Sequence, residues 1–387
     1  MNNYIYMDHA ATTYVDPQVF EYMKPYFSDI FYNASSLYSP ARDANQAIAD
    51  ARKTVARYLN AQNPDEIIFT SGGSESDNLA IFGMAMAHRD KGNHIITLPL
   101  EHHAVLHAVE AMDKLGFEHT IVDVDEDGIV NPQDIRKAIT DKTILITVMM
   151  ANNEIGTIEP IREIGEIARE KGILFHTDAV QAAGALPIDV DELNVDALSI
   201  SAHKFYGPKG VGALYLRQGT AVIPHLSGGS QENHRRAGTY NTPGIVGLAK
   251  ALELACENME ENNKKISGLR DRLVEKIMEK IPHTVYSGHP VKRLPNNASF
   301  CFKFIDSEAI LLHMDMLGIC ASAGSACTAS CEGASHVLSA IGVPFRVARG
   351  NIRFTLGKRN TEKEVDFVVE KMVGIVEKLR KMSPFSA

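Results

Sequence analysis

The sequence predicts an α/β protein, with a large three-layer α/β domain built on a mostly parallel sheet and a small α+β domain after it. At 387 residues the chain is too long for one ordinary core, which favours two domains that share an interface. Between residues 66 and 216, short β-rich runs alternate with helix-like segments, a pattern typical of parallel strands joined by crossover helices. After residue 243 the pattern changes to one long helical stretch, followed by a mixture of strands and helices.

The β-rich runs of the first part are the expected strands of the large sheet. The run Ile144-Leu145-Ile146-Thr147-Val148-Met149 is apolar almost throughout, as a strand covered on both faces should be. The strands are predicted over residues 66–70, 94–98, 119–124, 143–150, 173–177, 197–201 and 211–216.

The second part begins with a helical pattern from residue 245 to residue 280, which we expect to connect the two domains. It ends at Ile281-Pro282, where proline disfavours further helix. Strands are predicted over 298–304 and 351–356, and a helix over 307–317. Thr361 and Glu364 have the spacing of a capping box and predict a last helix that ends near Arg380. We assign residues 15–250 to the large domain, and residues 1–14 with 251–387 to the small one.

The composition limits the candidate ligands and the cellular compartments that we expect. The first residues show neither a basic leader nor a long apolar segment, and the five cysteines are an odd number, so we expect a cytoplasmic protein with free thiols. No apolar run reaches 18 residues, which argues against a membrane span. A formal net charge of -9 repels polyanions, so nucleic acid is a poor candidate for the main ligand. A small molecule or a protein partner fits better.

Lys204 is the first candidate catalytic residue. It lies in Ser201-Ala202-His203-Lys204, directly after a predicted strand and before a run of turn-forming residues. A lysine in a partly desolvated loop has a lowered pKa and can form a Schiff base. On its own, Lys204 would more readily be read as one more solvated cation.

Asp178 changes that interpretation. It follows another apolar strand, at the sheet edge where open α/β proteins bind ligands. A buried carboxylate there needs a cationic partner, and the pyridinium nitrogen of pyridoxal 5'-phosphate (PLP) is one. The alternative is an aspartate that caps the following helix, which is common.

A phosphate cradle is also predicted. The segment Thr70-Ser71-Gly72-Gly73-Ser74 runs from a strand through paired glycines into an expected helix. Backbone N–H groups at a helix N-terminus hold anions, and the Ser74 hydroxyl adds a donor. Glycine turns before helices are frequent, so this motif is weak alone.

Two further segments carry reactive side chains. His102 follows a strand and could stack on a cofactor ring or move protons, whereas His103 is expected to be structural. No spacing of ligands typical of a metal site accompanies these histidines, so no metal is expected. Cys327 lies in a run of small residues that cannot pack a core, which predicts an exposed thiol; the alternative is an incidental cysteine.

Together these segments resemble the group I cysteine desulfurases of the NifS and IscS type, which have the aspartate aminotransferase fold (fold type I) of PLP-dependent enzymes. The resemblance runs nearly end to end. It includes Met7-Asp8-His9-Ala10-Ala11-Thr12-Thr13, Asn152-Asn153-Glu154-Ile155-Gly156 and Asn351-Ile352-Arg353-Phe354, and its most specific marks are Lys204 and Cys327 in their motifs.

The resemblance implies an L-cysteine desulfurase that releases L-alanine and holds sulfur as a persulfide on Cys327 for an acceptor protein, such as an iron–sulfur scaffold. Lys204 would carry the cofactor, His102 would stack on its ring, and Thr239 would reach the phosphate site of a partner subunit in a homodimer. The resemblance also implies that Asp178 contacts the pyridinium and Gln181 the ring hydroxyl, and that the phosphate is held by Gly73, Ser74, Ser201 and His203. Asn153 would contact the cofactor and the substrate, and Arg353 would bind the substrate carboxylate.

The sequence departs from the family pattern at Ala34, Tyr38 and Ala41, and after Cys327, where Cys331 and small residues replace a leucine-proline pair. We expect Cys327 to be indispensable and Cys331 to be at most modulatory. A selenocysteine lyase or another C–S lyase is the nearest alternative. A non-catalytic scaffold for iron–sulfur assembly proteins is the alternative from another class.

Overall fold

The computed structural model describes residues 4–324 and 335–384, so Cys327 and Cys331 lie outside the described residues. Its centre is a seven-stranded sheet in the order β2-β8-β7-β6-β5-β3-β4, in which β8 runs opposite to the other six strands. The mostly parallel sheet is therefore confirmed. The strands are β2 (Ile67–Thr70), β3 (His94–Thr97), β4 (Glu118–Ile121), β5 (Thr143–Thr147), β6 (Leu174–Asp178), β7 (Ala197–Ser201) and β8 (Gly212–Leu216).

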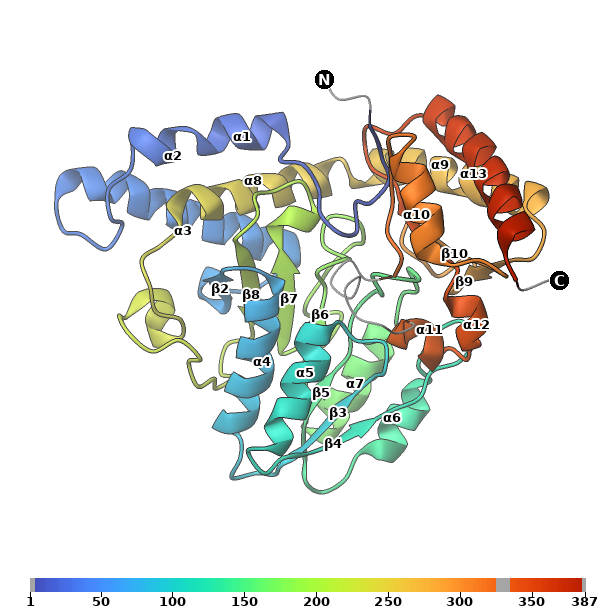
Figure 1. Ribbon diagram of the computed structural model, residues 1–387. Coiled ribbons are helices and arrows are strands. Elements are labelled where there is room, and N and C mark those ends of the chain that lie inside the picture. The colour runs from blue at the N-terminus through green and yellow to red at the C-terminus, as the bar shows by residue number, and fades with distance from the viewer. Residues whose placement is uncertain (1–3, 325–334, 385–387) are drawn as a thin grey trace.

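Helices cover both faces of this sheet and give the three layers (Figure 1). Successive strand residues point to opposite faces, so Ile67 and Phe69 pack in one apolar core while Ile68 packs in the other. The first core is completed by α3 (Ser39–Leu59), α6 (Pro132–Ala138), α7 (Ile161–Lys171) and α8 (Thr242–Glu257). The second is completed by α4 (Gly73–Ala87) and α5 (His103–Asp113).

The small part of the molecule is built on an antiparallel sheet in the order β12-β10-β9. The N-terminal segment joins it, because β1 (Ile5–Tyr6) pairs with β11 (Ile319–Cys320) and Met7 lies in its core. Thr361 caps the last helix with the predicted capping box. The other elements are α9 (Met259–Lys280), β9 (Thr284–Ser287), β10 (Asn297–Phe302), α10 (Ser307–Asp315), α11 (His336–Ala340), α12 (Phe345–Ala348), β12 (Asn351–Thr355) and α13 (Glu362–Met382).

The connection between the two parts differs from the single helix that the sequence predicts. Two helices, α8 and α9, meet at Asn258, whose side-chain amide donates to the Leu254 carbonyl (2.8 Å) and whose backbone is not helical. Ala251 and Leu252 still pack in the core of the large sheet. We therefore propose that the large domain extends from about residue 15 to Asn258, beyond the predicted boundary at 250.

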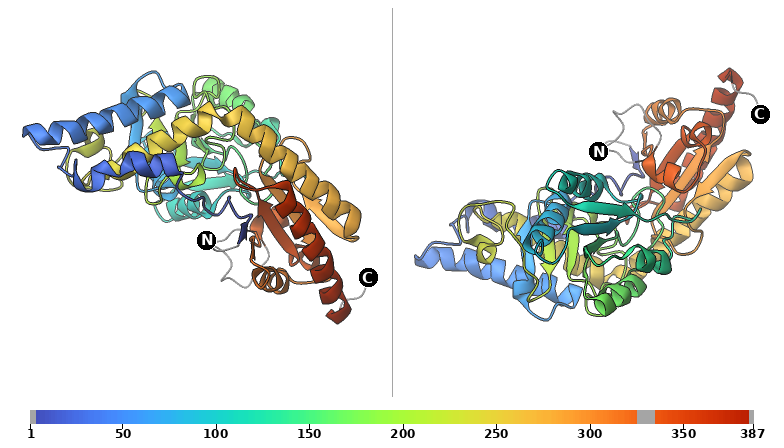
Figure 2. Two further views of the ribbon diagram at one scale, coloured as in Figure 1. Left: turned by 90° about the horizontal axis from the view of Figure 1, so that it is seen from above. Right: turned by 90° about the horizontal axis from the view of Figure 1, so that it is seen from below.

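Helices α1 (Pro17–Met23) and α2 (Pro25–Ser28) precede α3 and form a projection with its first turns. The projection and the small domain lie at opposite ends of the molecule in Figures 1 and 2. No helix in the described part of the chain is both long and apolar enough to cross a membrane.

Candidate active site

Two neighbouring cavities open at the carboxyl ends of the parallel strands, where the sequence places the site. The first measures about 200 Å³ and the second about 340 Å³. All the predicted site residues except Thr239 and Cys327 line the first cavity: Gly73, Ser74, His102, Asn153, Asp178, Gln181, Ser201, His203, Lys204 and Arg353.

Lys204 follows β7, at the end of the short turn Ala202–Lys204. Its amine donates to the Ala11 carbonyl (3.0 Å) and to the Ala10 carbonyl, both in the N-terminal segment. The side-chain amide of Gln181 also donates to Ala10 (3.1 Å). The N-terminal segment therefore forms one wall of the cavity and holds the reactive amine beside it.

Asp178 is the last residue of β6 and is 5% exposed. One of its oxygens accepts a hydrogen bond from the Val180 amide (2.8 Å). Burial raises the pKa of Asp178 to about 6, although the amide bond and Lys204 oppose the shift. A cation placed in the cavity would favour the ionised form.

His102 caps the N-terminus of α5, because its Nδ1 accepts from the Ala104 amide (3.1 Å). A neutral ring that accepts at Nδ1 carries its proton on Nε2. Burial, with a further contribution from Lys204, lowers the pKa of His102 to about 4, so the ring is neutral at pH 7. His103 instead packs against His107 and His336, with ring centroids 4.9 and 4.6 Å away.

The second cavity lies at the segment for which a phosphate cradle is predicted. Helix α4 begins at Gly73, and its first N–H groups face a space that Gly72, Ser74 and Ser201 also line. A Cβ on Gly73 would lie 2.7 Å from Cγ2 of Val180, so glycine is needed for this close approach. Thr12 and Lys209, which the sequence motifs did not single out, also line the cradle.

Arg353, on β12, closes the opposite side of the first cavity. Its Nη1 donates to the Asn153 carbonyl (2.9 Å) and its Nη2 donates to Asp8 (3.0 Å). Its Nε is buried and has no hydrogen-bond partner within the residues that the structure describes. Because Arg353 lines the cavity, its guanidinium can pair with a substrate carboxylate there.

The ends of the segment that carries Cys327 are within the described chain. Gly324 donates its amide to the Asn351 side chain (3.0 Å), and the Ser335 hydroxyl donates to Oε2 of Glu154 (2.5 Å). A Cβ on Gly324 would lie 3.0 Å from the same Glu154 oxygen. Both ends therefore meet at Glu154, next to the cavity residue Asn153.

Two buried acids were not recognised from the sequence: Asp77, which lines the first cavity, and Glu101. Burial raises the pKa values of Asp77 and Glu101 well above the usual range, and the charge of Asp178 adds to both shifts. Burial therefore favours the neutral form of both acids over the charged form. Glu101 follows the apolar stretch Leu98-Pro99-Leu100, which is a signal of burial, whereas Asp77 stands between Ser76 and Asn78 and has no such signal.

These features fit PLP. A buried carboxyl can pair with the pyridinium nitrogen, a cradle closed by Gly73 can hold the phosphate, and an amine stands beside the cavity. No group of three or more potential ligands in residues 4–324 and 335–384 could hold a metal ion.

Comparison with known proteins first defines the class. Residues 5–368 match the aminotransferase class-V family. The chain therefore belongs to this family of PLP-dependent fold type I enzymes, and more narrowly it is a member of the cysteine desulfurases.

Its relatives support the narrower assignment. The cysteine desulfurase IscS of Clostridium botulinum is 53% identical over 386 residues, which are 99% of this chain and 97% of the relative. The cysteine desulfurase IscS of Methanosarcina thermophila is 54% identical over 385 residues, 100% of this chain and 95% of the relative.

Solved structures agree. A NifS-like protein superimposes with a TM-score of 0.91 at 37% identity, covering 97% of this chain and all of that one. The apo structure of a cysteine desulfurase from Thermococcus onnurineus NA1 gives 0.86 at 26% identity, with 98% and 96% covered. The predicted fold, cofactor and enzyme class are confirmed.

Proposed function

We propose that this chain converts L-cysteine to L-alanine in the first cavity and passes the sulfur, as a persulfide on Cys327, to an acceptor protein. The observation that supports this most directly is that Lys204, Asp178, His102 and Arg353 line one cavity. An amine, a carboxyl, a neutral imidazole and a guanidinium together match a PLP site for an amino acid.

PLP, when bound, supplies an electron sink that stabilises negative charge at the substrate Cα. Lys204 would hold it covalently, and Asp178 would hold its pyridinium nitrogen. The Gln181 amide would contact the ring hydroxyl, His102 would cover the ring, and the N-terminus of α4 would hold the phosphate.

The chain's own groups then bind the substrate and move its protons. Arg353 holds the α-carboxylate, with Asn153 beside it, and this orients the Cα–H bond toward Lys204. The amine of Lys204 would be freed when the substrate amine replaces it on the cofactor, and it would then take the Cα proton. The Cys327 thiolate attacks the substrate sulfur, the Cβ–S bond breaks with its electron pair moving to the substrate, and protonation of that product leaves alanine.

A homodimer would complete the phosphate cradle. Thr239 is exposed and is not among the residues that line either cavity of its own chain. The segment that precedes Thr239 is anchored to the large domain at Glu232. The carboxylate of Glu232 accepts two hydrogen bonds from Arg52 (2.6 and 2.7 Å) and one from the Phe69 amide (3.2 Å). We propose that Thr239 reaches the cradle of a second copy.

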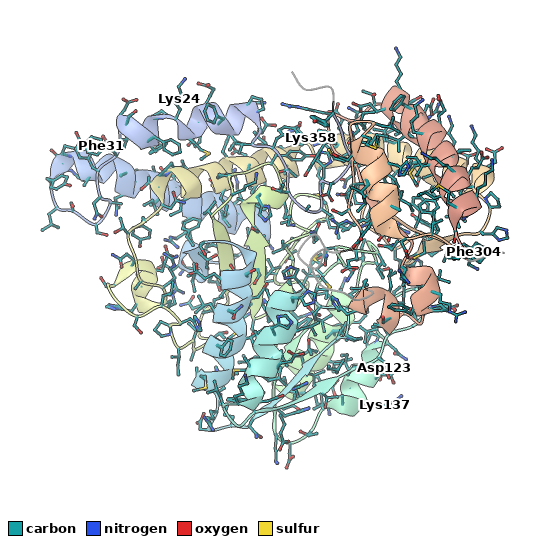
Figure 3. All side chains as sticks on the ribbon, viewed as in Figure 1. Lys24, Phe31, Asp123, Lys137, Phe304 and Lys358 are labelled. Carbon is teal, nitrogen blue, oxygen red and sulfur yellow. The ribbon has the colours of Figure 1, made fainter. Side chains whose placement is uncertain are left out.

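The projection offers a surface for that second copy. Its exposed aromatic side chains are Phe20, Tyr22, Phe27, Phe31 and Tyr38, with Phe31 at its tip in Figure 3. Exposed aromatic side chains concentrated on one projection are typical of an interface. The sulfur acceptor would be a protein such as an iron–sulfur scaffold.

The test is to incubate the purified protein with L-cysteine and a reductant, and to measure sulfide and alanine. We expect equal amounts of both, lost when PLP is removed and restored when it is added back. A protein that produces neither with PLP bound would contradict the proposal.

A single turnover without reductant locates the sulfur. We expect mass spectrometry to find the persulfide on Cys327. Cys327→Ser should keep the cofactor and lose the persulfide, whereas Cys331→Ser should keep activity under reducing conditions. A first persulfide on Cys331 would show that the nucleophile is wrongly assigned.

A further inference from the structure

The guanidinium of Arg353 is held by groups from outside its own strand. The Asn153 carbonyl accepts from Nη1 and the Asp8 carboxylate accepts from Nη2, at 2.9 and 3.0 Å. The Arg353 side chain is only 2% exposed, and a buried charge is costly unless it is paired. Within the described residues, Asp8 is the carboxylate that forms an ion pair with it.

Asp8 is itself fixed at several atoms. Its Oδ2 accepts from the Ser322 hydroxyl (2.8 Å), and its backbone carbonyl accepts from the Tyr6 hydroxyl (2.9 Å). Ser322 is in turn bound to the backbone of Arg353, which donates its amide to Ser322 (2.7 Å). Asp8, Ser322 and Arg353 therefore form a closed set of contacts.

This set fixes the plane of the guanidinium. An arginine side chain has several rotatable bonds, and paired recognition of a carboxylate requires its planar fork in one orientation. Asp8 and the Asn153 carbonyl use two of the five N–H donors of the guanidinium, which leaves others for a carboxylate in the cavity that Arg353 lines. Asp8 does not line the cavity itself.

We propose that Asp8 is a positioning residue for recognition of the substrate carboxylate: it fixes the orientation of Arg353, with the help of Ser322, and does not touch the substrate. This inference rests on the proposed role of Arg353. The inference gives the two residues different roles: Arg353 binds the carboxylate, and Asp8 fixes the direction of the guanidinium N–H groups that bind it.

The test compares two amines that differ in the carboxylate. The holoenzyme is titrated with L-alanine, the product, and with ethylamine, which lacks the carboxylate, and binding is followed by the visible absorbance of the cofactor. Asp8→Ala should weaken L-alanine binding about tenfold and change ethylamine binding less than about twofold. KM for L-cysteine should rise by about the same factor as the L-alanine Kd, and kcat should change less.

Conservative variants distinguish positioning from a general structural effect. Asp8→Asn keeps an oxygen that accepts from Nη2, so it should recover most of the affinity for L-alanine. Ser322→Ala should weaken L-alanine about threefold, and in the double variant with Asp8→Ala it should add nothing, because Ser322 acts through Asp8. If Asp8→Ala does not fold, Asp8→Asn and Ser322→Ala still provide this comparison.

The inference is overturned if Asp8→Ala leaves L-alanine binding unchanged, or weakens L-alanine and ethylamine equally. Ser322→Ala with unaltered L-alanine binding would also overturn it. The variant Arg353→Ala tests the role of Arg353 separately from the role of Asp8. If this variant still binds L-alanine in preference to ethylamine as the native protein does, the proposed role of Arg353 fails. If Arg353→Ala loses the discrimination and Asp8→Ala keeps it, only the inference about Asp8 fails.

Discussion

Lys204 provides the first prediction, because the amine that holds the cofactor would also move the substrate proton. Lys204→Ala should lower the rate of sulfide release by about 10³-fold or more. The visible absorbance of covalently held cofactor should also be lost. Lys137 is the control: it lies on α6 and pairs with Asp134 (2.7 Å) far from the cavities, so Lys137→Ala should keep full activity. A Lys204→Ala variant with normal turnover would refute the assignment.

Asp178 makes cofactor binding depend on pH. Its pKa of about 6 in the free protein means that the carboxyl is neutral below that pH and ionised above it. Only the ionised form pairs with a pyridinium, so the affinity of the apoprotein for PLP should fall as pH drops below about 6. Asp178→Asn should bind PLP weakly, and its affinity for PLP should change less with pH. Because the phosphate of PLP titrates equally with both proteins, comparison with this variant corrects for that titration. Equal pH profiles would contradict the pairing.

For single residues, the sequence reveals the site residues that directly follow a strand more readily than the residues that hold those side chains in place. Lys204, Asp178 and His102 all follow apolar runs, so they could be placed at one sheet edge before their distances were known. Asp8 could not be linked to Arg353, because their contact joins residues 345 positions apart. Asp77 and Glu101 required the packed structure to show that they are buried and that burial raises their pKa values.

Among the elements, the N-terminus of α4 offers the most specific test. Gly73→Ala adds a Cβ only 2.7 Å from Val180, so the cradle must widen and PLP affinity should fall about tenfold. Gly268 on α9 is the matched control, since a Cβ there meets nothing within 4 Å. Gly268→Ala should leave PLP affinity unchanged and stabilise the fold by about 1 kcal/mol. Titration of each apoprotein with PLP and thermal unfolding measure the two effects.

The elements themselves were predicted best where one physical signal dominates. Strand β7 has the predicted bounds, and Thr361 starts the last helix as its capping box predicts. The strand predicted over 143–150 ends at Thr147 in the structure, although the amides of Val148 and Met150 still donate to His176 and Asp178 of β6 (3.1 and 2.8 Å). The two-residue strands β1 and β11 were missed, since pairing between the two ends of a long chain has no local signature.

For the whole molecule, the projection predicts a dimer. Phe27 and Phe31 are 62% and 63% exposed in the single chain, so replacing both with glutamate should disrupt a surface that a second copy covers. Size-exclusion chromatography with light scattering should show a dimer for the native protein and a monomer for the double variant. The affinity for PLP should be lower in the monomeric double variant than in the dimer, because Thr239 of the second copy would no longer reach the cradle.

The control for this prediction lies on the small domain. Leu312 and Met316 are 67% and 83% exposed at the other end of the molecule, and the double variant Leu312→Glu with Met316→Glu should stay dimeric. A double variant of Phe27 and Phe31 that remains dimeric would place the interface elsewhere.

The meeting of Gly324 and Ser335 at Glu154 limits how far the sulfur can travel. Cys327 is the third residue after Gly324, and a fully extended chain advances at most about 3.6 Å per residue. While Gly324 keeps its place, the Cα of Cys327 therefore stays within a radius of about 11 Å from it, whatever path the chain takes. Sulfur held on Cys327 would thus stay on a short tether, and an acceptor would have to bring its own thiol to that tether.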